Sequence, residues 1–373
     1  MIGLVGKPSS GKSSFFKALT MLDVKIASYP FTTIEPNRGV AYVKVECACN
    51  KLDKRCNPRN SQCINGVRLI PVKILDVAGL VPGAHLGRGK GNKFLDDLRQ
   101  ADALIHIVDM SGKTDENGLE IENHDPLSDI EWLKQEIEMW VHGIIEKVWG
   151  KKHEEDAIVK QLSGFSPRNE IIEDCINEAG NDIKKLSRLV VEKTKPMIIA
   201  ANKMDLEEAK ENFESISAKL KERIVPCSAE MEIMARLAET KGIIKIDQKT
   251  GNFSINKEVS KEQENALKKM QDFIAKYGST GVQKCLDEAV FNLLNCIEVY
   301  PVENENSWAD SKGNILPDVY LVPSGTTAKE LASIVHTDLA KNFIAAIDAR
   351  KKMKIKDDHI LKKGDVIKIV AGK

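Results

Sequence analysis

The sequence predicts an α/β fold: a mostly parallel sheet that carries a helical insertion and is followed by a small β-grasp domain. Three observations support this class. Short apolar runs alternate with segments of helical periodicity in residues 1–110 and 196–299, which is typical of a parallel sheet covered on both faces. Residues 111–195 show only helical signals. Residues 300–373 then show strand, helix and strand within a short space.

The expected strands of the sheet domain are short and apolar. They are predicted at residues 1–5, 39–45, 67–77, 103–109 and 196–201. After the first strand, Phe15, Phe16, Leu19 and Leu22 recur at helical spacing and predict a helix over residues 12–22. Residues 46–64 form a cysteine-rich excursion between two strands, which we interpret as a hairpin.

The insertion is expected to be helical, with an antiparallel helix pair as the simplest arrangement. Ser128 and Glu131 have the spacing of a capping box at a helix start. One apolar face follows, made of Ile130, Leu133, Ile137, Trp140, Val141, Ile144 and Val148. The tryptophans of this region (Trp132, Trp140 and Trp149) are expected to pack in its core rather than to hold a ligand.

Composition limits the class of protein. The 373 residues contain 55 Lys and Arg against 55 Asp and Glu, so the overall charge favours neither nucleic acid nor acidic lipid. The sequence starts without a secretory pattern and contains no apolar run of the roughly 18 residues that a membrane span requires. Eight cysteines without such a signal are expected to be reduced thiols or metal ligands. We therefore expect a cytoplasmic protein with no membrane partner.

The segment GKPSSGKS, residues 6–13, matches the phosphate-binding pattern G-x-x-x-x-G-K-[ST] between a predicted strand and a predicted helix. Backbone N–H groups of such a loop wrap the phosphates, and the helix N-terminus adds its positive dipole end. Lys12 is expected to reach the β- and γ-phosphates, and Ser13 to bind Mg²⁺. The other residues expected to contact nucleotide here are Gly6, Ser9, Ser10, Gly11 and Ser14.

Two further tetrapeptides indicate which base is bound. NKMD (Asn202, Lys203, Asp205) follows an apolar strand, and ligands bind at the carboxyl ends of such strands. The Asp205 carboxylate can accept from both N1–H and the N2 amino group of guanine, a donor pair that adenine lacks. CSAE, residues 227–230, brings Ser228, Ala229 and Glu230, with the Ala229 N–H predicted to donate to guanine O6. Together with the phosphate loop, these motifs predict a GTP site.

The phosphate end is completed by DVAGL, residues 76–80. Asp76 is expected to hold Mg²⁺ through water, and the Gly79 N–H to contact the γ-phosphate. Upstream, Thr33 is the favoured threonine for closing over Mg²⁺, with Thr32 as the alternative. A glutamine that orients the attacking water often follows this motif, but Leu80 stands here and cannot orient water.

These residues resemble the Obg-related YchF family of P-loop GTPases, in particular its archaeal branch. The resemblance rests on YPFTTIEPNRG, DVAGLVPGAHLGRGKGNKFLDDLRQADALIHIVD and VHTDLAKNF, covers nearly the whole chain, and implies a C-terminal TGS domain, which is a β-grasp module. It also implies a hydrophobic residue at the glutamine position, as at Leu80, with the histidine of GAHxGxG, here His85, as the candidate catalytic group. An exposed loop histidine without a role is the alternative.

Two features separate this chain from some relatives. GTPases that use K⁺ carry an asparagine in the phosphate loop where this chain has Ser9, so K⁺ activation is not expected. Bacterial and eukaryotic members described as Obg-like ATPases have altered base-specificity residues. This chain keeps NKMD, so a preference for ATP is not expected either.

The cysteine-rich excursion holds Cys47, Cys49, Cys56 and Cys63. Four thiolates can close a tetrahedral, structural Zn²⁺ site. Their spacing, C-x-C-x₆-C-x₆-C, differs from the usual C-x₂-C pairs, so free cytosolic thiols remain the alternative. The other four cysteines are expected to be core or incidental thiols.

A basic segment lies in the last domain. From residue 319 onward there are eleven Lys and Arg against six Asp and Glu, and RKKMKIK, residues 350–356, holds five of these cations. Such a run suits phosphate contacts on RNA, although a solvated charged face is the alternative. The family resemblance favours RNA or a ribosome because TGS domains accompany translation-linked proteins.

The favoured interpretation is a Mg²⁺-dependent GTPase that converts GTP to GDP and phosphate and couples its nucleotide state to a ribosome or RNA partner. A nucleotide-dependent scaffold with little hydrolysis, caused by Leu80, is the second interpretation. An ATPase like the bacterial and eukaryotic relatives is the third.

Overall fold

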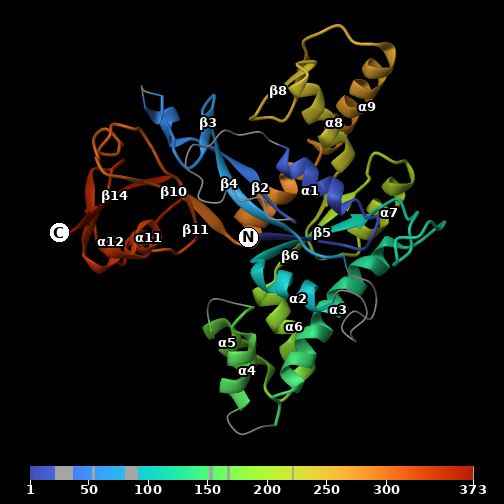
Figure 1. The fold of residues 1–373 in the computed structure, drawn as a ribbon, viewed down its shortest axis with the longest axis horizontal. Helices are drawn as coiled ribbons and strands as arrows, with labels where there is room; N and C mark the ends of the chain where they lie inside the picture. The colour runs from blue at the N-terminus through green and yellow to red at the C-terminus, as the bar shows by residue number, and fades with distance from the viewer. Residues whose placement is uncertain are drawn as a thin grey trace.

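The structure, a computed structural model, describes residues 1–21, 37–52, 55–79, 91–150, 154–165, 169–220 and 222–372. Figure 1 shows a central sheet flanked by helices, a helical insertion that projects from it, and a C-terminal sheet domain on the opposite side from α7.

The central sheet has the strand order β2-β4-β1-β5-β6-β7, with β3 added beside β4. β1, β4, β5, β6 and β7 run parallel, and β2 and β3 pair with β4 in antiparallel fashion. The predicted mostly parallel sheet is therefore confirmed. Its strands are β1 Ile2–Val5, β2 Arg38–Glu46, β3 Gln62–Ile64, β4 Val67–Asp76, β5 Ala103–Asp109, β6 Met197–Asn202 and β7 Ile224–Pro226.

Helices cover both faces of this sheet, as buried parallel strands require. A short hairpin, β8 and β9, lies with α8 and α9 at the top of Figure 1. The helices, turns and hairpin strands around the central sheet are α1 Lys12–Thr20, the 3₁₀ turn η1 Ala48–Lys51, α2 Gly91–Gln100, α7 Glu208–Ser217, α8 Ala229–Thr240, β8 Ile244–Ile246, β9 Phe253–Ile255, α9 Lys261–Tyr277, α10 Val282–Asp287 and the π-helical turn η3 Glu288–Leu293.

The insertion between β5 and β6 contains four described helices rather than one antiparallel pair: α3 Pro126–Glu146, α4 Glu154–Leu162, α5 Asn169–Ala179 and α6 Ile183–Thr194. The predicted capping box is wrong. Asp125 is the N-cap of α3 and accepts from the Leu127 N–H, and Pro126 occupies the first turn, where its missing N–H costs nothing. Trp132 and Trp149 pack, partly buried, against the core of the insertion.

The C-terminal sheet has the order β11-β10-β14-β12-β13, in which β10 and β14 are parallel. α11 is amphipathic and buries Ala328, Leu331 and Ala332 in the core of this domain. The predicted β-grasp domain is confirmed. Its elements are β10 Cys296–Val302, β11 Tyr320–Pro323, α11 Ala328–Val335, α12 Thr337–Lys341, β12 Phe343–Asp348, β13 Met353–Ile355 and β14 Asp365–Ala371.

One apolar core runs from the central sheet into the C-terminal domain. It contains Val43 of β2, Cys47, Tyr300 of β10 and Leu316, so the two sheets are packed against each other rather than tethered by a linker. Among the described residues, no helix has the length and apolar character needed to cross a membrane.

Candidate nucleotide site

The phosphate loop connects the end of β1 to the start of α1, where the motif places it. Gly11 is the N-cap of α1 and has φ +89°, a left-handed conformation that glycine adopts without strain. A Cβ atom at Gly11 would also overlap with the side-chain amide of Asn202. The glycine is therefore required both for the turn and for the approach of the NKMD segment.

Asn202 links the three nucleotide-binding segments. Its Nδ2 donates to the Ser10 carbonyl at 3.0 Å, and its Oδ1 accepts from the Ala229 N–H at 3.0 Å. Both bonds are buried, so each also satisfies a backbone group that water cannot reach. Asn202 thus positions the other residues of the site.

Backbone hydrogen bonds hold NKMD against CSAE. The Cys227 N–H donates to the Ala201 carbonyl at 2.8 Å, and the Met204 N–H donates to the Cys227 carbonyl at 3.1 Å. Ser228 is buried as the N-cap of α8 and accepts from the Met231 N–H, whereas Glu230 is exposed. The two segments that the sequence predicts to contact guanine therefore form one unit.

The two charged residues of NKMD have different surroundings. Lys203 Nζ lies 2.7 Å from Oδ2 of the fully buried Asp109. Burial acts to raise the pKa of Asp109, but hydrogen bonds from Lys203 and Ser111 lower it below the ordinary value. Asp205 is partly buried, and its carboxylate makes no hydrogen bond or ion pair with a described residue. The Asp205 carboxylate is therefore available to accept hydrogen bonds from a ligand, whereas the Asp109 carboxylate is already paired with Lys203.

The phosphate end lies where β1 and β4 run side by side, with Leu4 in register with Asp76. Lys12 Nζ forms an ion pair with Asp76 Oδ1. A Cβ built at Gly79 would lie 3.9 Å from the Gly6 carbonyl oxygen, so the DxxG segment borders the phosphate loop. Ser13 and Ser14 are exposed in the first turn of α1.

Four predicted residues of the phosphate end lie outside the described residues: Thr32, Thr33, Leu80 and His85. The roles expected for them stay predictions.

A buried ion pair that the sequence analysis missed attaches the phosphate loop to the insertion. Lys7 Nζ lies 2.8 Å from Asp129 Oδ2, and both side chains are almost fully buried. Lys7 also donates to the Thr114 carbonyl at 2.5 Å, and His124 Nε2 lies 2.8 Å from Asp129 Oδ1. Ser9 adds a hydrogen bond to the Gly118 carbonyl at 3.0 Å. No local pattern could have revealed this pair, because Asp129 stands on α3, far along the chain.

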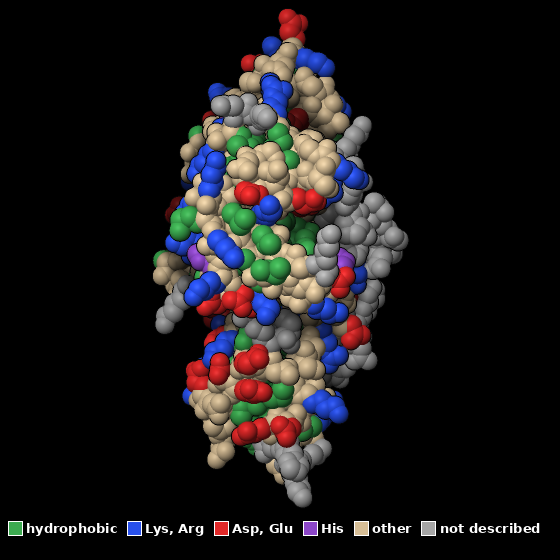
Figure 2. All heavy atoms as spheres, turned by 90° about the vertical axis from the view of Figure 1, so that its left-hand side faces the viewer, with side chains coloured by type: hydrophobic (Ala, Val, Ile, Leu, Met, Phe, Trp, Pro, Cys, Tyr) green, Lys and Arg blue, Asp and Glu red, His purple; other side chains and the backbone are tan. Residues whose placement is uncertain are grey.

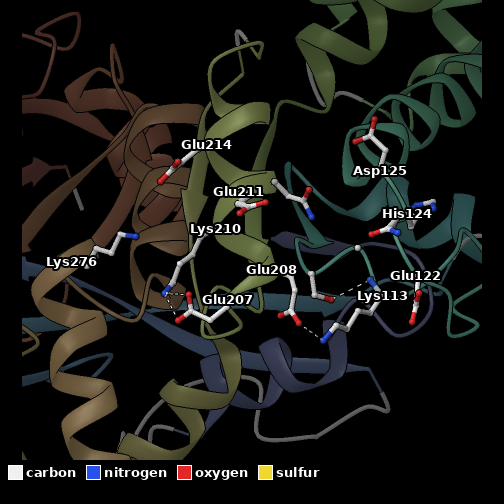
Figure 3. A pocket seen from close by; sticks show the side chains of 14 residues that line it. Lys113, Glu122, His124, Asp125, Glu207, Glu208, Lys210, Glu211, Glu214 and Lys276 are labelled. Carbon is white, nitrogen blue, oxygen red and sulfur yellow. Dashed lines mark hydrogen bonds and ion pairs between the residues drawn. The ribbon is translucent and has the colours of Figure 1, made fainter.

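A cavity of about 900 Å³ lies away from the phosphate loop. Figure 3 shows that its walls come from the segment after β5, from α7 and from α9, with acidic side chains such as Glu122, Asp125 and Glu211 around it. Lys113 pairs with Glu208, and Lys210 pairs with Glu207. An acidic wall of this kind repels a polyphosphate, so this cavity does not compete with the motif site for the nucleotide.

The four cysteines of the excursion converge. The sulfur atoms of Cys47 and Cys56 lie 3.8 Å apart, as do those of Cys49 and Cys63, and all four lie within 4.8 Å of one another. Cys47 is buried, and the other three are partly buried. Hydrogen bonds from the Cys56 and Cys63 thiols lower the pKa of Cys47 to about 2, whereas burial and the neighbouring sulfurs raise the pKa of Cys49 to about 12.

The basic segment 350–356 forms the turn after β12 and the strand β13. Arg350 lies over the Trp308 ring, and Lys351 pairs with Asp348, whereas Lys352, Lys354 and Lys356 are exposed and form no ion pair with a described residue. Figure 2, which faces the C-terminal side of the molecule, shows basic and acidic side chains interspersed around hydrophobic ones. The exposed cations of this segment that have no ion pair with a described residue are thus these three lysines, which lie close together along the chain.

Known families match along most of the chain. A family described as 50S ribosome-binding GTPase matches residues 1–140, the G4 motif-containing domain of Obg-like YGR210-like GTPases matches residues 200–304, and the TGS domain matches residues 312–371.

Whole proteins match over similar lengths. A GTP-binding protein of Methanocaldococcus jannaschii is 49% identical over 100% of this chain and 99% of its own. The ribosome-binding ATPase YchF of Bacillus subtilis is 27% identical over 92% of this chain and 87% of its own. The crystal structure of a GTP-binding protein from Pyrococcus horikoshii superimposes with a TM-score of 0.78 at 35% identity, covering 100% of this chain and 99% of that one.

The motifs, the sheet that positions them and these relatives all indicate the same family. The chain belongs to the Obg-related, YchF-type family of P-loop GTPases with a C-terminal TGS domain.

Proposed function

We propose that this protein is a Mg²⁺-dependent GTP hydrolase whose nucleotide state is coupled to a ribosome or another RNA partner. The observation that carries the proposal is the base end of the site. Asn202 ties the phosphate loop to Ala229, and Asp205, just beyond the end of β6, has a carboxylate with no hydrogen bond or ion pair to a described residue.

Base recognition follows from the acceptor at Asp205. Its two oxygens match the N1–H and N2 amino donors of guanine, and each charge-assisted hydrogen bond contributes about 1.5–3 kcal/mol. Adenine offers no such pair. The Ala229 N–H is already directed at Asn202, whereas the Glu230 N–H, in the first turn of α8, has no acceptor among the described residues. We infer that Glu230 supplies part of the contact to guanine O6 that the sequence assigns to Ala229.

The phosphate end fits a magnesium nucleotide. Ser13 Oγ, in the first turn of α1, and the Asp76 carboxylate, at the end of β4, are candidate oxygen ligands, and Mg²⁺ prefers a few protein oxygens together with water and phosphate. When bound, the ion neutralises charge on the β- and γ-phosphates. Lys12, held by Asp76 in this structure, supplies a second positive charge to the same phosphates. Gly79 offers a backbone N–H beside Gly6.

Hydrolysis requires a group that orients water, which Leu80 cannot do. We assign that role to His85 and expect slow turnover without a partner. A nucleotide-dependent scaffold is the second candidate, since no arginine finger is evident in the sequence. Thr33, or Thr32 in its place, would close over the magnesium nucleotide.

The partner proposal rests on three supports. The matched family is described as ribosome-binding, the Bacillus subtilis relative is named a ribosome-binding ATPase, and Lys352, Lys354 and Lys356 form an exposed cationic segment on the TGS domain. Phosphate contacts by such cations give affinity without reading base sequence.

The test replaces Asp205 with Asn and measures binding of GTP, ATP and xanthosine triphosphate by calorimetry. An amide donates where the carboxylate accepts, so Asp205→Asn should bind GTP at least about 100-fold more weakly, because two charge-assisted bonds are lost. The same variant should gain affinity for xanthosine triphosphate, whose C2 oxygen can accept from the new amide. Unchanged GTP preference would refute base recognition by Asp205, and wild-type preference for ATP would favour the ATPase interpretation.

A further inference from the structure

We propose that Cys47, Cys49, Cys56 and Cys63 bind one Zn²⁺ ion, and that this ion fastens residues 47–63 to the C-terminal domain. A tetrahedral zinc site with Zn–S bonds of about 2.3 Å has sulfur–sulfur distances of about 3.8 Å. The Cys47–Cys56 and Cys49–Cys63 pairs have that separation, and all four sulfurs lie within 4.8 Å of one another. The remaining pairs come to the same separation by shifts of about 1 Å or less, which fit side-chain adjustment around an ion.

A buried arginine lies beside the cluster, where zinc-bound thiolates would supply a counter-charge. Arg68, at the start of β4, is fully buried. Its Nη1 lies 3.5 Å from the Cys56 sulfur and 3.9 Å from the Cys47 sulfur. Among the described residues, no carboxylate forms an ion pair with Arg68. A buried guanidinium without a counter-charge is costly.

The charge of the cluster therefore distinguishes its states. Four thiolates around one divalent ion carry a net negative charge, larger than a metal-free cluster of mostly protonated thiols offers Arg68. The N–H groups of Arg68 then donate to ligand sulfurs, which is the usual way in which neighbouring residues orient and tune metal ligands. Arg68 thus has the place and the charge of a supporting residue for a tetrathiolate metal site.

The same arginine joins the cluster to the C-terminal domain. Arg68 Nη2 donates to the Leu316 carbonyl at 2.6 Å, and its guanidinium lies 5.5 Å from the centre of the Tyr300 ring. Cys47, Tyr300 and Leu316 share one apolar core. Figure 1 shows the excursion that carries β3 beside the C-terminal sheet domain.

The loop between Cys56 and Cys63 makes the remaining contacts. The Asn57 N–H donates to the Ile315 carbonyl at 3.1 Å, and the Arg59 N–H donates to the Pro317 carbonyl at 2.7 Å. The Val319 N–H donates to Asn60 Oδ1 at 3.1 Å. This loop has little regular structure of its own, so an ion that ties both of its ends reduces the entropy cost of holding it in this shape.

The first experiment measures the metal content of the purified full-length chain by mass spectrometry of the elements. We expect about one Zn²⁺ per chain, lost in Cys49→Ser and in Cys63→Ser and retained in the matched control Cys296→Ser, whose thiol is also partly buried but lies outside the cluster. After chelation, Co²⁺ should restore the visible absorption of tetrahedral cobalt thiolate in the wild type and in the control only.

Several results would overturn the site. They are reduced wild-type protein that neither contains nor takes up Zn²⁺, a bound ion that survives both cluster substitutions, iron in place of zinc, or a protein mass that shows two disulfides. The wild-type measurements do not depend on the folding of any variant.

The second experiment tests the fastening role by amide hydrogen exchange with and without chelator. The Asn57, Arg59 and Val319 amides should exchange at least about tenfold faster once zinc is removed. GTP binding in added Mg²⁺ should change less than about twofold, because the nucleotide site lies at the other end of β4. Unchanged exchange at these amides in demonstrably zinc-free protein would refute the fastening role. The outcome is independent of the GTPase proposal, since neither readout requires hydrolysis.

Discussion

Strand β4 carries two different sites at its two ends. Asp76, at its carboxyl end, belongs to the proposed phosphate site, and Arg68, near its amino end, lies beside the cysteine cluster proposed to bind zinc. Eight strand residues of about 3.4 Å rise separate them by about 27 Å. At the first end, short motifs of fixed spacing supply backbone donors. At the second, side chains from distant segments assemble. Local spacing therefore predicts the first site well and the second only in part.

The largest expected effect falls on the Asp76 end. Lys12→Ala removes the cation that we propose reaches the β- and γ-phosphates, so phosphate release from GTP should fall about 10²–10³-fold. Zinc content should stay unchanged. Lys17→Ala, an exposed lysine on the same helix, is the matched control and should keep near wild-type turnover in the same phosphate-release assay. Equal turnover by Lys12→Ala and the control would remove Lys12 from the mechanism.

The next largest effect concerns the buried ion pair between Lys7 and Asp129. Lys7→Met removes the cation paired with the buried Asp129 carboxylate, leaves it, among the described residues, only its contact with His124, and should lower the free energy of unfolding by about 3–5 kcal/mol. Urea denaturation measures this, and chelation should not alter the difference between Lys7→Met and wild type. The double variant Lys7→Met/Asp129→Leu should recover part of the loss, because no buried charge remains unpaired. No recovery would mean that the ion pair is not the cause.

A smaller effect concerns pH. His106 of β5 is fully buried near Lys7, and burial lowers its pKa to about 3. Below about pH 6.5 the His106 imidazole binds a proton in the unfolded chain but not in the folded chain. The free energy of unfolding should therefore fall as pH drops from about 6.5 towards 3. The slope is up to about 1.4 kcal/mol per pH unit for this one group. His106→Gln should flatten that part of the curve of unfolding free energy against pH, and an unchanged curve would contradict the assignment.

The smallest effect is expected at the TGS domain. Replacing Lys354 with Ala should weaken RNA or ribosome binding only a few-fold and lower the salt slope of log K by about 1. Lys329→Ala, an exposed lysine of α11 outside the segment, is the control in a filter-binding titration over salt concentration. Equal slopes for both variants would leave segment 350–356 as a solvated face.

The sequence predicts much of this molecule for identifiable reasons. Buried parallel strands are apolar runs, so the residues of β1, β4, β5 and β6 were predictable to within about two positions. The order of the nucleotide motifs along the chain also predicted which strand ends meet, because parallel strands place their carboxyl ends at one edge.

The remainder depends on contacts between distant residues. Asp125 caps α3 in place of Ser128 because Pro126 favours the first turn of a helix, a choice between neighbours that spacing alone left open. The Lys7–Asp129 pair and the contacts of Arg68 with Cys56 and Leu316 exist only once the chain is folded. These are the features that distinguish the two ends of β4.

The proposed activity of this site is hydrolysis of GTP rather than ATP. It is tested most directly by steady-state phosphate release from GTP and ATP, side by side, by the purified chain with Mg²⁺, repeated with His85→Ala. We expect turnover of GTP, little turnover of ATP, and a large loss of GTP turnover in His85→Ala. Turnover of ATP in preference to GTP, or of neither nucleotide, would contradict it.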